Sequence, residues 1–422
     1  MSVILYIFHR DFRLEDHNGL TFVNQLLKEP LYKDCKVLPL FVFTPEQVSK
    51  KNPYRSIHSI QFMIESLMEL NTELHSERTR LFCFYGSNLD VIEQLLASVS
   101  IKAIVETKDY TPFAKKRESD FRQLCMLRSI SYFSPEDIYL TNPGSVLTGT
   151  GKTFQKFTPF WETARKRPVL KPFGKVLLPW YTSRLALPNE VHLTAMRKKF
   201  VPYENRRIHV KGGRSEGLSL LKNLPESYDT TRDYPAYETS NLSAHNHYGT
   251  ISIREVFWAG KAKKIHEFVR QLYWRDFYGH IMNDFEHLYG QDPFTFMKEA
   301  GPGWKTDTKA FTQWCNGKTG HELVDAGMRQ LNSTGYMHNR VRLVAASYLA
   351  KEERIHWRWG ERYFATKLVD YDVTQNMMNW IWVSSVLPFA SAPYRRLDPE
   401  LQAERLDELK QYRAKWLDVK EK

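Results

Sequence analysis

The stretch from Trp314 to Trp382 most constrains the fold, because it combines helical apolar spacing with polar residues that a packed interior normally rejects. The run LVDAGMRQL places its apolar residues at helical spacing, and VRLVAASYL and ERYFATKLV follow as two further helices. Polar residues lie in or between these runs: His338, Asn339, Arg342, Asp370, Asp372 and Asn376. Because buried polar groups need partners, the stretch predicts helices that face one another around a large polar ligand.

The first 135 residues alternate strand and helix patterns. Strands are expected at Val3–Phe8, Val37–Phe43, Leu81–Tyr85 and Ala103–Glu106, with a weaker one at Ile130–Phe133. The clearest helix is SIQFMIESLMELNTEL, which carries Ile60, Ile64, Leu67, Met68 and Leu74 on one face. This alternation predicts an α/β domain with a Rossmann-like parallel sheet. No G-x-G-x-x-G follows the first strand, so a dinucleotide site of that type is not supported.

Two further regions follow. Residues 136–205 are rich in Pro, Gly, Thr and basic residues, which predicts a long interdomain connection, whereas residues 206–422 are expected to be all helical. Residues 141–200 hold 11 Lys and Arg against 2 Asp and Glu. Such a basic stripe suits a polyanion such as nucleic acid, although a solvated linker has the same composition.

The remaining composition excludes several classes of protein. No apolar run approaches the roughly 18 residues of a membrane span, and the start of the chain does not match a secretory signal, so we expect an intracellular protein, cytoplasmic or nuclear. Cys35, Cys83, Cys125 and Cys315 stand singly, which predicts neither a metal site nor a disulfide framework.

The stretch GKTGHELVDAGMRQLNSTGYMHNRVRLVAASYL, followed by WRWGERYF and D-Y-D, closely resembles the flavin-binding core of the photolyase/cryptochrome family. The segment HRDFRLEDHNGL resembles the family's first strand-to-helix turn. Within the family the chain is most similar to class I photolyases that repair cyclobutane pyrimidine dimers. The resemblance implies an α/β antenna domain, a helical FAD-binding catalytic domain and FAD as the cofactor.

The resemblance also implies which residues bind FAD. Thr239, Ser240, Leu242 and Ser243 match the family's T-S-x-L-S, which holds the flavin diphosphate, although Asn241 replaces the usual basic residue. Asp370 and Arg342 match an ion pair over the ring, and Asp372 matches a carboxylate near the pyrimidine edge. Asn376 matches the residue that faces flavin N5. The remaining residues expected at the cofactor are Tyr228, Gln271 and Asn339.

Three tryptophans match the family's relay, which passes electrons from the surface to the flavin: Trp380, Trp357 and Trp304. Each alone would be a core residue, but the three in register favour a relay.

Lesion and DNA contacts are implied by further matches. Gln271, Trp274 and Arg275 share one helix face, where the aromatic and the cation are expected to be exposed together. The lesion would be flipped out of the duplex to reach a buried flavin. The other residues expected to contact lesion or DNA are Arg232, Asn339, Arg340, Leu343, Trp382 and Arg396.

These matches predict light-dependent splitting of cyclobutane pyrimidine dimers by electron transfer from photoexcited reduced FAD, in a monomer acting on UV-damaged DNA. One alternative is repair of (6-4) photoproducts, favoured by Gln271 but opposed by Asn339 and Leu343, which replace histidines of that group. A second is a cryptochrome-type photoreceptor without repair activity, although the sequence ends soon after Arg396 without a signalling tail. A third is a nucleic-acid-binding flavoprotein without a light function.

The family's α/β domain often carries an antenna chromophore, a folate or a deazaflavin. The segment ETKDYTPFAKKRESD lies where relatives contact it. Within this segment, Lys108 and Asp109 are expected to be ordinary loop residues.

Overall fold

The computed structural model describes residues 2–185, 187–290, 303–387 and 396–418. Its first part is a five-stranded parallel sheet in the order β3-β2-β1-β4-β5, with β1 in the centre. The strands are β1 (Ser2–Ile7), β2 (Lys36–Phe43), β3 (Phe82–Tyr85), β4 (Ser100–Glu106) and β5 (Ser131–Phe133). The predicted strands are therefore confirmed, each to within three residues at either end.

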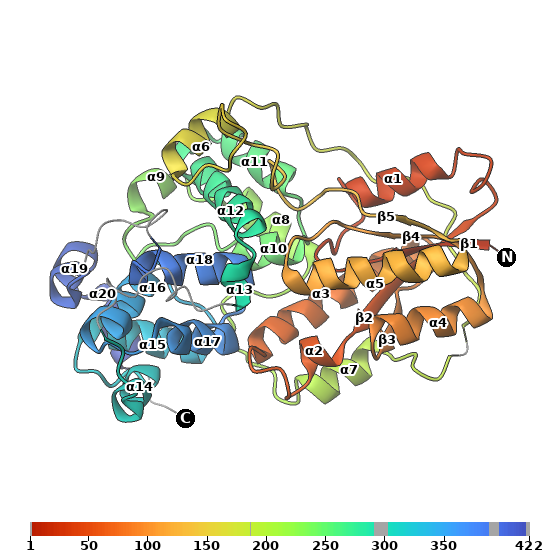
Figure 1. The fold of residues 1–422 in the computed structure, drawn as a ribbon. Helices are drawn as coiled ribbons and strands as arrows, with labels where there is room; N and C mark the ends of the chain where they lie inside the picture. The colour runs from red at the N-terminus through yellow and green to blue at the C-terminus, as the bar shows by residue number, and fades with distance from the viewer. Residues whose placement is uncertain (1, 186, 291–302, 388–395, 419–422) are drawn as a thin grey trace.

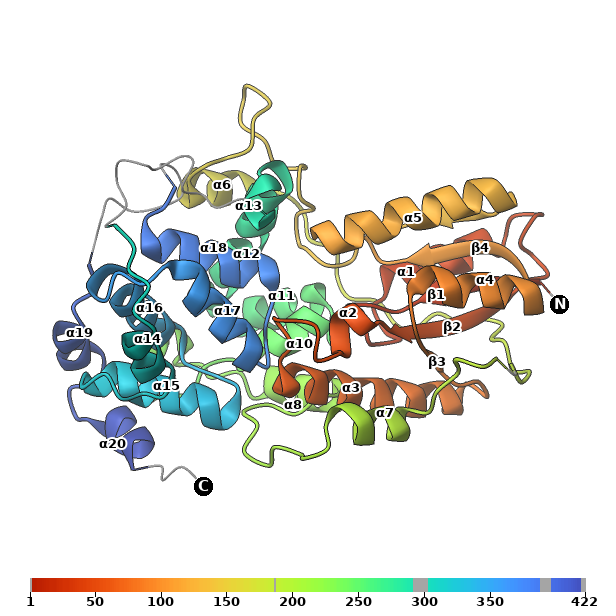
Figure 2. The same cartoon turned by 60° about the horizontal axis from the view of Figure 1, so that its bottom comes forward.

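Helices cover both faces of this sheet (Figures 1 and 2). Ile4 and Tyr6 of β1 pack with α1 (Asn18–Leu26) and α3 (Ile57–Ser76). The alternate residues Val3, Leu5 and Ile7 pack with α4 (Asn88–Ser98) and α5 (Pro112–Arg128). A strand that is buried on both faces has a continuous apolar sequence, which is why β1 and β2 could be predicted.

The strand order creates a natural place for a ligand. From β1 the chain moves to β2 and β3 on one side, and then returns to β4 on the other side of β1. In open parallel sheets, ligands bind outside the carboxyl ends of the strands where the direction of winding changes. These strand ends point toward the helical half of the molecule (Figures 1 and 2).

The connection between the two halves contains two helices. Its first helix, α6 (Phe157–Ala164), packs on the helical half, and its second, α7 (Leu193–Phe200), packs on α3. Between them the chain follows the sheet, where Val37 N donates to Pro179 O at 2.9 Å. The connection thus packs against both halves of the molecule.

The second half is helical, as predicted. The three helices expected around the polar stretch are α15 (Glu322–Thr334), α16 (Asn339–Ser347) and α17 (Trp357–Lys367). The sequence explains several ends: Ser252 forms a capping box, Gly335 ends α15 in the left-handed region, and Asp372 caps α18 (Val373–Ser384). The other helices of this half are α8 (Arg214–Lys222), α9 (Tyr228–Thr231), α10 (Ser243–Tyr248), α11 (Ile253–Ala262), α12 (His266–Asp284), α13 (His287–Gly290), α14 (Thr308–Cys315), η2 (Tyr348–Glu352), α19 (Pro399–Leu406) and α20 (Gln411–Leu417).

Among the described residues, no helix is both long and apolar enough to cross a bilayer, and no cluster of His, Cys, Asp and Glu side chains could hold a metal ion. All four cysteines are buried as free thiols.

Candidate functional site

A cavity of about 540 Å³ opens between α12, α16 and α18; we call it the helical cavity. Most of the residues predicted to bind a cofactor line it, although they come from segments up to 148 positions apart in the chain, from Tyr228 to Asn376. The predicted cofactor residues on its wall are Tyr228, Ser240, Ser243, Gln271, Asn339, Arg342, Asp370, Asp372 and Asn376. The predicted lesion and DNA residues on the same wall are Arg232, Trp274, Arg275, Arg340, Leu343 and Trp382.

Two predicted cofactor residues lie outside this wall. Thr239 bonds through Oγ1 to Asn241 Oδ1 at 3.3 Å, and Leu242 is buried in the hydrophobic core just before α10. They hold the loop that presents Ser240 and Ser243 to the cavity.

The ion pair between Arg342 and Asp370 is present on the cavity wall. Arg342 Nη2 lies 2.9 Å from Asp370 Oδ2, and Arg342 Nε donates to Met337 O at 2.7 Å. Burial alone would raise the pKa of Asp370, but the Arg342 guanidinium outweighs it and holds this pKa below its ordinary value. The wall therefore carries a fixed carboxylate and a fixed cation side by side.

Asp372 is more heavily engaged than the sequence indicated. Its Oδ1 accepts from Gln375 N at 3.1 Å and its Oδ2 accepts from Arg10, which comes from the far half of the chain. His247 Nδ1 lies 3.2 Å from the same Oδ2. Burial favours the neutral acid, yet Arg10 and His247 together hold the pKa of Asp372 well below its ordinary range. Asp372 is thus a buried carboxylate anion.

Asn376 is oriented by a buried acid. Its amide nitrogen donates to Glu361 Oε1 and to Glu361 O, both at 3.1 Å. Glu361 is fully buried, and this burial raises its pKa to about 7. The amide is therefore held in one orientation where α18 meets the cavity.

The expectation that Trp274 and Arg275 are exposed together was wrong. Both line the cavity but are half-buried, because Trp274 stacks on Phe157 of α6 with ring centroids 3.7 Å apart. Arg275 donates through Nη1 to Ile138 O at 2.6 Å and lies over the Tyr139 ring. The connection supplies both partners, and α12 alone gave no sign of them.

The three tryptophans lie at different depths. Trp380 is 2% exposed and lines the cavity, and Trp357 is completely buried. Trp304 is half-buried and its ring lies 5.2 Å from that of His356, which in turn stacks 6.1 Å from Trp357. Trp304 and Trp357 thus both lie against the ring of His356, and Trp380 lies on the cavity wall.

Of the four arginines expected to contact DNA phosphates, Arg232, Arg340 and Arg396 are paired with acids, whereas Arg275 donates to the backbone oxygens of Ile138 and Asn246. Arg340 is bidentate to Asp233 at 2.9 Å, and Arg232 lies 3.3 Å from Glu267. Arg396, whose side chain is 56% exposed, lies 2.8 Å from Glu352. Surface pairs of this kind are weak, so each arginine can exchange its carboxylate for a phosphate at low cost.

Several wall residues were missed in the sequence. Asn246 and His247 lie three and four positions after Ser243 on α10, so helical spacing from Ser243 could have indicated them. Gln375 adjoins Asn376 and bonds through Nε2 to Arg275 O at 3.0 Å. No local signal indicated Arg10, which reaches Asp372 across 362 positions of sequence.

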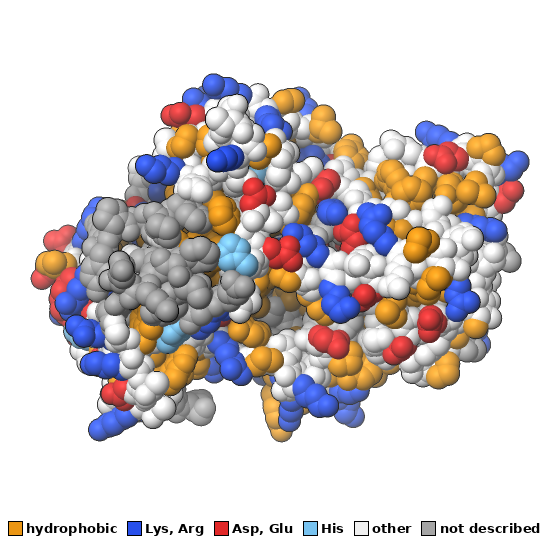
Figure 3. Space-filling model, viewed as in Figure 1, with side chains coloured by type: hydrophobic (Ala, Val, Ile, Leu, Met, Phe, Trp, Pro, Cys, Tyr) orange, Lys and Arg blue, Asp and Glu red, His pale blue; other side chains and the backbone are white. Residues whose placement is uncertain are grey.

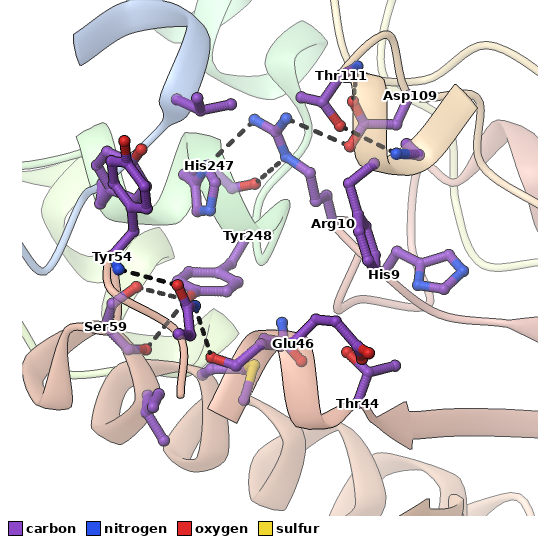
Figure 4. A pocket seen from close by; sticks show the side chains of 18 of the residues that line it. His9, Arg10, Thr44, Glu46, Tyr54, Ser59, Asp109, Thr111, His247 and Tyr248 are labelled. Atoms are coloured by element: carbon purple, nitrogen blue, oxygen red, sulfur yellow. Dashed lines mark hydrogen bonds and ion pairs between the residues drawn. The ribbon is translucent and has the colours of Figure 1, made fainter. Parts of the chain in front are cut away.

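A second cavity of about 270 Å³ lies at the carboxyl ends of β1, β2 and β4; we call it the sheet-edge cavity (Figure 4). Its apolar walls include Phe41, Ile60, Met63 and Tyr248. Arg10 reaches between His247 and Asp109 at its upper side, so Asp109 is more than an ordinary loop residue. Lys108 instead pairs with Glu118 at 3.0 Å.

The residues of the helical cavity fit FAD. The wall combines aromatic surface at Trp274 and Trp380 with hydroxyls at Ser240 and Ser243. The Asn246 side-chain oxygen is buried there without a hydrogen-bond partner, which indicates a polar ligand. The volume of the helical cavity is in the range of cofactor pockets.

Comparisons with known proteins agree with this assignment. Residues 4–176 match the family model for DNA photolyase, and residues 268–422 match that for the FAD binding domain of DNA photolyase. The chain is 30% identical to the deoxyribodipyrimidine photo-lyase of Alkalihalophilus pseudofirmus over 95% of this chain and 84% of that relative. The identity to the Escherichia coli deoxyribodipyrimidine photo-lyase is 28%, over 99% and 89%.

Solved structures give the same result. The photolyase of the archaeon Sulfolobus tokodaii, which was crystallised with two FAD molecules, has 35% identity and a TM-score of 0.86, covering 99% of this chain and 90% of that one. A class III photolyase from Agrobacterium tumefaciens has 26% identity and a TM-score of 0.86, covering 99% and 86%.

Proposed function

The chain belongs to the DNA photolyase family, and we propose on this premise that it is a light-driven lyase that splits cyclobutane pyrimidine dimers in UV-damaged DNA. The observation that carries the proposal is the helical cavity, where the residues expected at FAD and those expected at the lesion share one wall. When bound, FAD supplies light absorption and the electron that opens the cyclobutane ring.

The residues of the wall would divide the remaining work. Arg342 and Asp370 would hold the cofactor through their fixed charges, and Asn376 would present an amide whose orientation Glu361 sets. Trp274 and Trp382 would bracket the lesion with flat apolar surface, and Gln271 would offer hydrogen bonds. Trp304, Trp357 and Trp380 would return electrons to the cofactor from the surface.

The dimer must leave the duplex to enter this cavity, so the protein would bind flipped nucleotides and grip the flanking backbone. Arg232 and Arg340 lie on the cavity wall and would exchange their surface carboxylates for phosphates. Arg396 would do the same nearby. Because the proposed substrate is UV-damaged DNA, we place the protein inside the cell, where it would act as a monomer.

One observation favours dimers over (6-4) photoproducts. His338, the residue that would serve as an acid in the latter chemistry, is buried and accepts a hydrogen bond from Arg340 N at its Nδ1. Burial lowers its pKa to about 4, so it is neutral at physiological pH and is a poor proton donor. The neighbouring residue is Asn339, which cannot replace it.

The sheet-edge cavity would hold the antenna chromophore. Its place at the winding change of the sheet and its apolar walls suit a flat aromatic ligand. Arg10 and Arg117 are paired with Asp109, Asp372 and Glu106, whereas Arg55 donates to the backbone oxygens of Val48 and Phe200 and would offer its charge to an anionic part of the ligand. These residues would accept either a folate or a deazaflavin.

The test is repair by the purified protein loaded with FAD and chemically reduced. Oligonucleotides that carry either a cyclobutane dimer or a (6-4) photoproduct are illuminated, and restored thymines are quantified, with matched samples kept dark. We expect restoration of the dimer only, and only in light. Repair of the (6-4) lesion alone would transfer the assignment to the other enzyme, and repair of neither would refute both.

A further inference from the structure

A buried arginine joins the two cavities described above. Arg10 follows β1 and points away from the sheet into the helical half. Its Nη2 bonds to Asp372 Oδ2, its Nε donates to His247 O at 3.1 Å, and its Nη1 lies 3.5 Å from Asp109 Oδ2. One side chain thus contacts an acid of each cavity, Asp109 of the sheet-edge cavity, as Figure 4 shows, and Asp372 of the helical cavity.

This contact is largely shielded from solvent. The side chains of Arg10 and Asp372 are 11% and 7% exposed, and that of Asp109 is 11% exposed. In such surroundings a charge pair is poorly screened, and removing one member leaves an uncompensated charge. Without Arg10, Asp109 and Asp372 would face each other as two buried carboxylates.

The position of Asp372 determines where two residues of the helical cavity lie. It is the cap of α18, and the next turn of that helix carries Gln375 and Asn376 onto the cavity wall. Gln375 N donates to Asp372 Oδ1 at 3.1 Å, and Asn376 N donates to Asp372 O at 2.8 Å. A shift of Asp372 would therefore displace both side chains.

We propose that Arg10 is a positioning residue for the flavin site: it fixes Asp372 and the start of α18 from the α/β domain, and so couples the sheet-edge cavity to the helical cavity. His247 belongs to the same contact, because it lines both cavities and lies 3.2 Å from both Arg10 Nη2 and Asp372 Oδ2. The inference rests on the proposed function, since it requires FAD in the helical cavity.

The test compares two buried arginines that both join the halves of the molecule. Arg254 bonds to Asp16 at 3.0 Å and to Asp137 at 2.8 Å and is 6% exposed, but it lines neither cavity. Arg10→Met and Arg254→Met should both lower the melting temperature of the FAD-free protein. Arg10→Met alone should weaken FAD binding, by about tenfold, as expected for a residue that acts through another.

FAD affinity is measured by titration of each variant. Arg342→Ala removes a residue of the helical cavity, so the part of the titration that disappears in this variant reports binding in that cavity. At saturating FAD, the absorption band of the bound flavin should change in Arg10→Met and remain unchanged in Arg254→Met. Arg10→Lys keeps the positive charge but cannot make all the hydrogen bonds of the guanidinium, so its FAD affinity should lie between those of Arg10→Met and the wild type. It also replaces Arg10→Met in the test if that variant does not fold. Arg10→Met combined with Asp372→Asn should bind no worse than the weaker single variant.

Equal affinity and an unchanged band in Arg10→Met or Arg10→Lys would overturn the inference. So would a loss of affinity in Arg254→Met as large as that in Arg10→Met, because the effect would then be general destabilisation. Failure of the wild-type protein to bind FAD would refute the proposed function, and the inference with it.

Discussion

At the residue scale, Glu361 has an unusual setting for an acid. It is fully buried, one carboxyl oxygen accepts from Asn376, and the other has no hydrogen-bond partner. Burial raises its pKa from the ordinary 4.5 to about 7. Folding therefore favours the protonated form of Glu361. The Asn376 amide on the cavity wall is thus hydrogen-bonded to an acid that changes charge near neutral pH.

This shift predicts a pH-dependent loss of stability. The pKa of Glu361 is higher in the folded than in the unfolded protein. Its contribution to the unfolding free energy is therefore fully present at low pH and is lost as the pH rises toward 7. Between pH 5 and 8 the wild type should lose about 2.5 kcal/mol more unfolding free energy than Glu361→Gln. Urea denaturation across this range measures the difference. The exposed Glu404→Gln should follow the wild type, and parallel curves for all three proteins would contradict the assignment.

Arg396 provides a second prediction at this scale. Its side chain is exposed, and we expect it to contact a phosphate, a group that carries no sequence or lesion information. Arg396→Ala should weaken binding to damaged and undamaged DNA alike and should lower the slope of log K against log salt by about 1. Fluorescence anisotropy at several salt concentrations measures this slope. Arg128→Ala, at the exposed end of α5, is the control; a loss confined to damaged DNA would exclude a phosphate contact.

At the element scale, the contact between α17 and α18 sets the position of Trp380. Gly360 of α17 lies so close that an added Cβ would meet Trp380 Cη2 at 2.2 Å and Leu349 Cδ2 at 2.6 Å. Trp380 in turn lines the helical cavity. The small residue therefore allows the helix pair to bring an indole to the cavity wall.

Gly360→Ala should force this contact apart. We expect a loss of about 1–3 kcal/mol of unfolding free energy, typical of overpacking, together with weaker FAD binding. Thermal unfolding and FAD titration measure the two effects. Gly149→Ala, which has nothing within 4 Å of the added carbon, should change neither. A fully stable Gly360→Ala that binds FAD normally would show that Trp380 can move at little cost.

The elements themselves could largely be predicted from the sequence, for physical reasons. The strands β1 and β2 are buried on both faces and appear as uninterrupted apolar runs, and α15 ends at a glycine in the left-handed region. What failed was the exposure of Trp274, because its partner Phe157 belongs to a different segment. Local patterns specify which face of a helix is apolar, whereas the residue that covers that face is set by tertiary packing.

At the scale of the whole molecule, the basic stripe of residues 141–200 does not form one surface. On the face seen in Figure 3, Lys and Arg side chains are scattered and do not gather in one patch. Arg165, Lys166 and Arg167 follow α6, which packs on the cavity wall through the stacking of Phe157 on Trp274. The later basic residues lie on the α/β domain, where Lys175 pairs with Glu77 and Lys199 lies over Tyr85. Composition located the charge in the sequence, but only the path of the chain divides it between two sites.

This division predicts that only the first group contacts DNA. Replacing Arg165 and Lys166 by Glu should weaken DNA binding and lower the salt slope by about 2, since two cations at the end of α6 are lost. The same reversal at Lys198 and Lys199 of α7 should leave both quantities unchanged. Salt titrations of the two double variants decide the matter. Equal losses would indicate a diffuse effect of net charge instead of a defined path for the backbone.

The long reach of Arg10 has a consequence for how the molecule is made. Its strand leaves the ribosome long before α18, whose capping acid lies 362 residues further on. Proteins commonly fold from the N-terminal domain onward during synthesis, so the sheet would stand ready with an unmatched cation until the final helices arrive. Capture of the nucleotide would then be one of the last events in maturation, and helices expressed on their own would lack the counter-ion that their buried aspartate requires.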